Sequence, residues 1–217
     1  MTSQNSRNIA AGAAWSLAFA YLAAEIVTAY AWKTTYSFQH RTISDLGVTD
    51  CTPELCSPLH PLMNATFVTL GVLTIFGAVL FSVAIPHGYR RRLIVSLAVL
   101  TGLSTAATGL VPSNYGIVPH MLAVLPGFIA RHILLILVAI WMWQQHRLVA
   151  ILAALCALSG LSGIILLVAT PVHIGISERI VLYPLPVFMA FTGTAIMTAT
   201  LVKVRSQRRA LRHRDAD

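Results

Sequence analysis

The sequence predicts an all-α, polytopic membrane protein, a bundle of six transmembrane helices with both termini on the cytoplasmic side. The first observation is composition, since 57% of the 217 residues are hydrophobic and only 10% are charged, whereas soluble proteins carry about 25% charged residues. The second is six apolar segments, each near the length of about 20 residues that crosses a bilayer. The third is the gathering of basic residues on one side of those segments.

The predicted transmembrane helices cover residues of about 10–31, 60–85, 93–111, 120–143, 148–169 and 179–202 in a single domain of residues 1–217. Turn signals such as Pro86-His87-Gly88 separate them. Ala29-Tyr30-Ala31 resembles a signal-peptidase site, but the long apolar run before it carries Glu25, which predicts a retained helix. The remaining segments are a predicted external loop, 32–59, and a cytoplasmic basic tail, 203–217.

Basic residues set the predicted orientation. With the N-terminus inside, Arg7, residues 90–92, Arg147 and six residues of the tail face the cytoplasm, which accounts for 11 of the 15 Lys and Arg. The same clustering argues against a nucleic-acid partner, despite the net charge of +8, because no basic face with interleaved aromatic residues is present. Acidic residues outside the tail all fall toward the external side: Glu25, Asp45, Asp50, Glu54 and Glu178.

Two cysteines in the predicted external loop, Cys51 and Cys56, favour a disulfide, because an oxidising exterior allows such a bond to persist. A pair of metal-binding thiolates or two free thiols are the alternatives. Cys156 lies within a predicted helix and is interpreted as a small core residue.

The predicted ligand-binding residues are polar groups that gather near the external ends of the helices. Capping of helix ends is the competing explanation for each of them taken alone. Together they predict an outward-facing polar pocket, formed by Arg41, Ser44, Asp45, His60, Asn64, His120, Glu178 and Arg179.

Two further features lie deeper in the predicted bundle. Thr101, Ser104, Thr105 and Thr108 share one helical face, which predicts an inward polar stripe made for interhelical hydrogen bonds or for ligand contact. Intramembrane charges are usually paired or lie in a wet cavity, so we expect an ion pair between Glu25 and Arg131; the alternative is that these groups form the floor of the predicted polar pocket. No role is assigned to Arg131 or to the neighbouring His132 beyond this.

Three segments near the predicted external side resemble the sequence signature of one known family. Residues 41–64, RTISDLGVTDCTPELCSPLHPLMN, resemble the signature of the bacterial and archaeal membrane family called domain of unknown function 998. His120 after a Pro-Ser-Asn loop, and the block from Gly175 through Glu178-Arg179 to Tyr183-Pro184, are similar to further parts of that signature. Arg131-His132 departs from it. The resemblance implies a six-helix bundle, distantly like DRAM-type proteins, and supplies no activity.

The sequence leaves two functions open. The leading interpretation is a plasma-membrane protein whose pocket binds a lipid headgroup or a small polar molecule, with Arg41 and Arg179 contacting an anionic group. Trp32, Tyr36 and Phe38 are then interfacial anchors. The alternative is an intramembrane hydrolase at the outer leaflet, with the candidate catalytic residues Asp45, His60, His120 and Glu178.

Cofactors and partners follow from the same residues. No cofactor is expected; weak alternatives are a metal held by His60, His120 and His173, and a haem held by His60 or His120 with His132. Membrane lipids are the expected partners, no nucleic acid is expected, and protein partners are left open. A transporter is disfavoured because no segment shows an interrupted helix in matched halves.

Overall fold

Six helical spans, each long and apolar enough to cross a membrane, make up the computed structural model, which describes residues 2–214 apart from the side chains of residue 171 and residues 210–214. No β-strand occurs among these residues. The spans, in chain order, are α1 (Ser3–Ser16) with α2 (Phe19–Tyr30), α3 (His60–Phe81), α4 (Tyr89–Leu110), α5 (Ile117–Met142), α6 (Arg147–Ala169), and α7 (Ile174–Leu182) with α8 (Pro184–Arg214). The predicted all-α, six-span class is confirmed.

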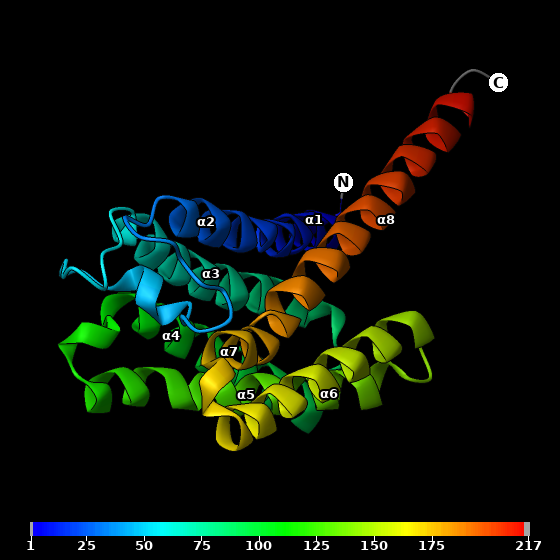
Figure 1. Cartoon of the computed structure of the whole chain (residues 1–217). Coiled ribbons are helices and arrows are strands. Elements are labelled where there is room, and N and C mark those ends of the chain that lie inside the picture. The colour runs from blue at the N-terminus through cyan, green and yellow to red at the C-terminus, as the bar shows by residue number, and fades with distance from the viewer. Residues whose placement is uncertain (1, 215–217) are drawn as a thin grey trace.

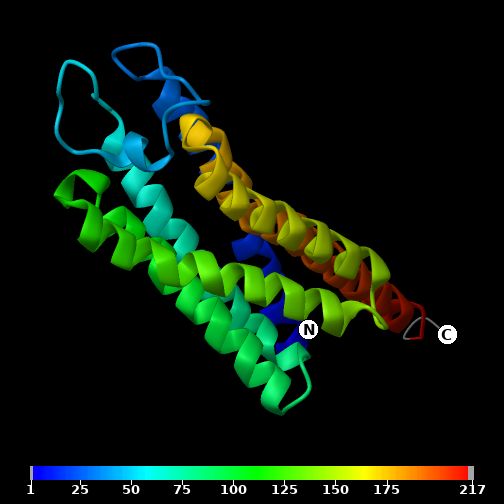
Figure 2. The ribbon, with the colours of Figure 1, turned by 60° about the horizontal axis from the view of Figure 1, so that its bottom comes forward.

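The spans lie alongside one another in one bundle (Figure 1), and their contacts close into a ring. Helix α4 packs between α3 and α5, α5 packs on α6, and α6 packs on α7 and α8, while α1 lies against both α8 and α3 and completes the circuit. The connection of residues 32–59 covers one end of the bundle, and both termini lie toward the other (Figure 2). We call these the loop end and the tail end.

Close helix contacts depend on small residues. A Cβ atom added to Gly102 of α4 would lie only 2.6 Å from the carbonyl oxygen of Gly71 in α3. Any larger residue at this crossing would push the two backbones apart, which is why small residues recur at interfaces inside membranes. Many large apolar side chains instead face outward, as expected for contact with lipid, including Leu103, Leu110 and Ile165.

Two spans differ from the predicted bounds and continuity. The first begins at Ser3 and is interrupted at residues 17–18, and the sixth begins at Ile174 and is interrupted at Tyr183. Pro184 explains the second interruption. Proline disrupts a helix interior but is tolerated in the first turn, so α7 ends before it and α8 begins at it. No interrupted helix in matched halves was identified from the sequence, whereas the structure has an interruption in the first span and one in the sixth. Helix α8 also continues to Arg214, well into the predicted tail.

The loop end is covered by an ordered cap. Its short 3₁₀ helix η1 (Ser44–Gly47) inserts Leu46, which is fully buried as is the preceding Ile43. Ser57 donates a hydrogen bond to the Leu46 carbonyl oxygen (2.7 Å). The predicted Cys51–Cys56 disulfide is confirmed. This covalent ring and the buried η1 fix the segment against the helix ends.

Two aromatic residues of this cap are buried in the protein core and do not face the membrane–water interface. Trp32 and Tyr36 are only 7% and 9% exposed, and their rings meet edge to face. The prediction that these two are interfacial anchors was wrong, because an aromatic residue with a polar tip suits either a bilayer interface or a buried polar network. Phe38 is partly exposed.

Candidate functional site

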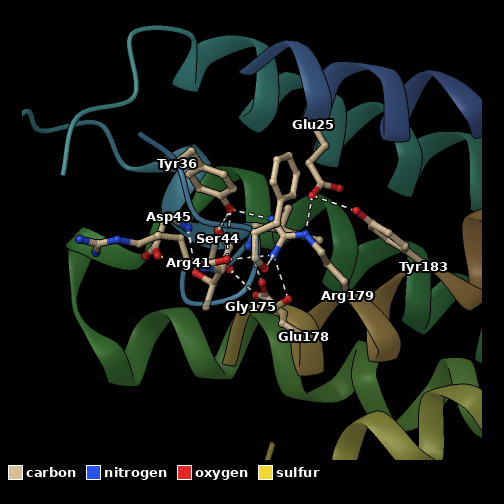
Figure 3. A network of polar contacts seen from close by, with 12 residues as sticks. Glu25, Tyr36, Arg41, Ser44, Asp45, Gly175, Glu178, Arg179 and Tyr183 are labelled. Atoms are coloured by element: carbon tan, nitrogen blue, oxygen red, sulfur yellow. Dashed lines mark hydrogen bonds and ion pairs between the residues drawn. The ribbon is translucent and has the colours of Figure 1, made fainter. Parts of the chain in front are cut away.

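Arg179 of α7 lies at the centre of a buried polar network at the loop end (Figure 3). Its Nε donates to the Glu25 carboxylate of α2 at 2.8 Å, the one ion pair among the described residues. Its Nη1 is within hydrogen-bonding distance of three carbonyl oxygens, those of Phe38, Arg41 and Gly175. The cation therefore joins two spans to the cap.

Two tyrosines complete this Arg179 network. Tyr183 donates to the Glu25 carboxylate (3.0 Å), and the Tyr36 hydroxyl accepts from Arg179 Nη2 (2.7 Å) while donating to the Thr42 carbonyl oxygen (2.6 Å). Burial raises the pKa of the Tyr36 phenol above its usual value, although Arg179 opposes that shift. The phenol is thereby kept neutral, as a donor to Thr42 must be.

Gly175 allows the cap to approach α7. A Cβ atom here would come within 2.5 Å of the Phe38 carbonyl oxygen and closer still to that of Arg41. The Gly175 backbone N–H donates to the Gln39 carbonyl oxygen (3.1 Å). The absence of a side chain thus lets three carbonyls of the cap reach α7, and two of them reach Arg179.

Glu178 begins a second network on the other side of α7. It accepts from the Ile43 backbone N–H and, at 3.1 Å, from the Ser44 hydroxyl. The same Ser44 oxygen lies 3.1 Å from Nε2 of His120, whose Nδ1 is 2.7 Å from the Val111 carbonyl oxygen. Glu178, Ser44 and His120 therefore form one continuous chain of hydrogen-bonding groups.

Arg131 of α5 stands apart from both networks. Its side chain is buried, Nε donates to the Gly127 carbonyl oxygen (2.9 Å), and the guanidinium lies 5.3 Å from the centre of the Phe128 ring. The predicted ion pair between Glu25 and Arg131 was wrong, since Glu25 pairs with Arg179. These partners are separated by 154 positions, so nothing in the local sequence distinguishes one arginine from the other.

Three other predicted site residues lie in the cap and in the first turns of α3. Arg41 Nη2 donates to the Glu54 carbonyl oxygen (3.2 Å), and its guanidinium points away from Arg179 (Figure 3). Asp45 and Thr42 cap each other's backbone N–H groups, as the capping alternative anticipated. Asn64 donates to the Gly47 carbonyl oxygen (2.8 Å), which fixes the end of η1 on α3.

The histidines do not converge. His60 is partly exposed and makes no side-chain hydrogen bond within the described part of the chain. His173 lies beside Gln39 (2.7 Å) near the surface, and His132 turns toward its own helix at Phe128. The described residues contain no group of three His, Cys, Asp or Glu side chains placed to hold a metal ion.

The polar stripe of α4 has two uses. Ser104 joins helices, because its hydroxyl accepts from the Gly127 backbone N–H (2.8 Å) and lies against carbonyl oxygens of α5. Thr105 donates to a carbonyl oxygen of its own helix, and its side chain lines an internal cavity with Thr108. The predicted inward orientation is confirmed.

Comparison with known families identifies the family of this chain. The family described as "Protein of unknown function (DUF998)" matches residues 10–195. The chain belongs to the DUF998 family. No curated protein and no solved structure matches it.

The three sequence blocks that resemble the DUF998 signature meet in space. Ser44 comes from the first block, His120 from the second and Glu178 from the third, and the hydrogen-bond chain described above contains one residue of each. Sequence reasoning identified all three as candidates. It missed Tyr36 and Tyr183 as members of the Arg179 network, although Tyr183 stood in the third block and was a usable signal.

A lateral groove of about 450 Å³ lies between α6 and the α7–α8 junction of this DUF998 protein. Its apolar lining includes Phe38 of the cap, Leu155 of α6, Ile176 of α7 and Val187 of α8. Arg179 and Tyr183 are the residues through which the groove touches the buried network. No sequence pattern indicated this groove, since its walls come from three helices and the cap.

Proposed function

We propose that the protein binds a membrane lipid, with one hydrocarbon chain in the groove between α6 and the α7–α8 junction. The observation that carries the proposal is an open, mainly apolar groove with Arg179 in its wall. Ligand sites are typically apolar concavities with a few placed polar groups. An acyl or isoprenoid chain matches such a wall.

The polar part of the lipid is placed by Arg179. A guanidinium has five N–H donors, and Glu25, the cap carbonyls and Tyr36 engage one on Nε, two on Nη1 and one on Nη2. One Nη2 donor is left without an acceptor among the described residues. Because Glu25 already neutralises the cation, an uncharged or zwitterionic lipid oxygen suits this donor better than a second anion.

The loop end is proposed to face outward. Eleven of the 15 Lys and Arg then lie inside, in agreement with the positive-inside rule. The Cys51–Cys56 disulfide supports the same orientation, because such bonds persist in oxidising compartments. In intact cells, Tyr115→Cys at the loop end should react with a membrane-impermeant maleimide and Ser206→Cys in α8 should not; the reverse pattern would overturn the orientation.

Lipid binding is tested by filling the groove. Leu155 lines it, whereas Leu158 lies on the same helix, is similarly exposed and does not line it. We expect Leu155→Trp to lower the lipid retained through purification several-fold, measured by mass spectrometry of extracts, with Leu158→Trp unchanged. Equal retention by wild type and both variants would contradict the proposal.

Hydrolysis is a second candidate, favoured by the contact between Ser44 and His120. A nucleophile near a base that a third group orients is the usual arrangement for covalent catalysis, and here the Val111 carbonyl oxygen orients the imidazole. Of the other predicted catalytic residues, Glu178 touches Ser44, whereas Asp45 and His60 make no hydrogen bond to this pair. Fluorophosphonate labelling of Ser44 that is lost in His120→Gln would support hydrolysis, and no labelling in wild type would exclude it.

A further inference from the structure

A small internal cavity separates Arg131 from Glu178. Its polar walls are Arg131, Glu178, Ser44 and Tyr21, together with Thr105 and Thr108, and its volume of about 20 Å³ holds one water-sized body. We call it the Arg131 cavity. It lies on the face of α7 that carries Glu178, whereas the lateral groove is lined by Arg179.

Two buried hydrogen-bond donors at this cavity, the Arg131 guanidinium and the Tyr21 hydroxyl, lack sufficient acceptors among the described residues. Arg131 is 5% exposed and no carboxylate lies within 4.0 Å of its guanidinium among the described residues. Tyr21 is 2% exposed, and its hydroxyl has no hydrogen-bond partner in that part of the chain. A buried cation inside a membrane is costly unless carbonyl oxygens or a negative charge compensate it, and the Gly127 carbonyl oxygen engages only Nε of Arg131. Glu25 supplies no counter-charge, because it is paired with Arg179.

The Glu178–Ser44–His120 chain is one proton short of satisfying all of its hydrogen bonds when Glu178 is ionised and His120 is neutral. A carbonyl oxygen only accepts, so Nδ1 of His120 carries a hydrogen toward Val111. With His120 neutral and Glu178 ionised, the single Ser44 hydrogen satisfies either the carboxylate or Nε2, but never both 3.1 Å contacts. One added proton, on Glu178 or on His120, satisfies both contacts and makes the chain electrically neutral.

That added proton changes the charge facing Arg131. Without it, ionised Glu178 balances Arg131 across the cavity. With it, the Glu178–Ser44–His120 chain is neutral and Arg131 lacks a counter-charge. The other charged or titratable groups around Glu178 do not supply one at the cavity. The acid Glu25 and the cation Arg179 cancel, and the phenols of Tyr21, Tyr36 and Tyr183 are neutral. The half-buried Asp45 carboxylate accepts from the Thr42 backbone N–H and does not line the cavity.

We propose that the Arg131 cavity binds one small monovalent anion together with one proton. The anion accepts hydrogen bonds from Arg131 and Tyr21, and the proton is held by the Glu178–Ser44–His120 chain. The cavity volume limits the anion to about the size of a halide. One negative and one positive charge enter together, so the net charge of the membrane interior is unchanged.

Chloride, with gluconate as an oversized control anion, tests this proposal on the purified full chain. Chloride should raise the midpoint of thermal unfolding at acidic pH, because a ligand stabilises the state that binds it. Its affinity should fall about tenfold per pH unit once the proton is lost, as linkage of one proton to one anion requires. At a pH where the chloride-free chain lacks this proton, adding chloride to an unbuffered sample should take up about one proton from solution per anion bound.

Variants separate the two ligands. Arg131→Gln should abolish the chloride response, and Glu178→Gln, which fixes a neutral side chain, should retain it and make it independent of pH. Arg147→Gln, which removes a cation near Trp143 at the tail end, is the matched control and should behave as wild type.

Three results would overturn the proposal: equal midpoints in chloride and gluconate at acidic pH, chloride binding without proton uptake at a pH where the chloride-free chain lacks the proton, or an unchanged response in Arg131→Gln. The first two are measured on the wild-type chain, so they decide the question even where a variant fails to fold. Stabilisation by anionic lipid with no response to chloride would also count against it. None of these results bears on the groove, so lipid binding there is judged separately.

Discussion

Arg179 and Arg131 are buried to nearly the same extent, 7% and 5% exposed, yet their surroundings differ sharply. Arg179 has a carboxylate, three carbonyl oxygens and a phenol within hydrogen-bonding distance. Arg131 has one carbonyl oxygen and an aromatic ring. The comparison separates two ways of keeping a cation in an apolar medium, one by fixed partners and the other by a cavity that faces an ionisable group.

Breaking the fixed partners should have the largest effect. Glu25→Gln preserves shape but leaves Arg179 without its counter-charge, which should lower the free energy of unfolding by about 3–5 kcal/mol. Denaturant unfolding in detergent measures this change. The double variant Glu25→Gln, Arg179→Gln removes both charges and should recover much of the loss, whereas an additive further loss would show that the pair is not the unit of stability.

Arg131 should respond in the opposite direction. In gluconate at acidic pH, where the Glu178 chain is neutral, Arg131→Met removes an uncompensated charge and should stabilise the fold by about 1–4 kcal/mol, since apolar replacement of buried charge is often favourable. The same unfolding measurement applies. A destabilisation as large as that of Glu25→Gln would mean that both arginines are held alike.

The fit between the cap and α7 is the next point of contrast, because only the Arg179 network uses it. Gly175→Ala places a methyl group against the Phe38 and Arg41 carbonyl oxygens and should destabilise the protein by about 1–3 kcal/mol, as overpacking typically does. Proteolysis of the cap should quicken in parallel. Unchanged protection of residues 32–59 would show that the cap does not depend on this close approach.

Hydropathy and charge predicted the six spans well, because the bilayer imposes a length and a composition on each of them separately. The candidate site was predicted less completely from the sequence than the spans were. Ser44, His120 and Glu178 were found because each lies in a distinctive block near a helix end. The choice of Arg179 over Arg131 as the partner of Glu25 depends on how the ring of helices closes. Pro184 marks the interruption of the sixth span, but no local sequence pattern indicates the lateral groove.

Tyr36 illustrates the same limit at a single residue. An aromatic side chain with a hydroxyl, next to a transmembrane helix, predicts an interfacial anchor. In the structure its hydroxyl lies between Arg179 and the Thr42 carbonyl oxygen. The two positions differ only in whether the cap folds over the ring, which is a tertiary property.

Arg41 should show the smallest effect and so defines the edge of the Arg179 network. Its backbone carbonyl accepts from Arg179, but its side chain makes only a surface contact with the Glu54 carbonyl oxygen. Arg41→Gln should therefore change the free energy of unfolding by less than about 0.5 kcal/mol, as for most surface substitutions. It should also leave lipid retention unaltered, measured beside Leu155→Trp. A several-fold loss of retained lipid in Arg41→Gln would restore the original prediction that this cation contacts the ligand and would move the polar end of the site from α7 onto the cap.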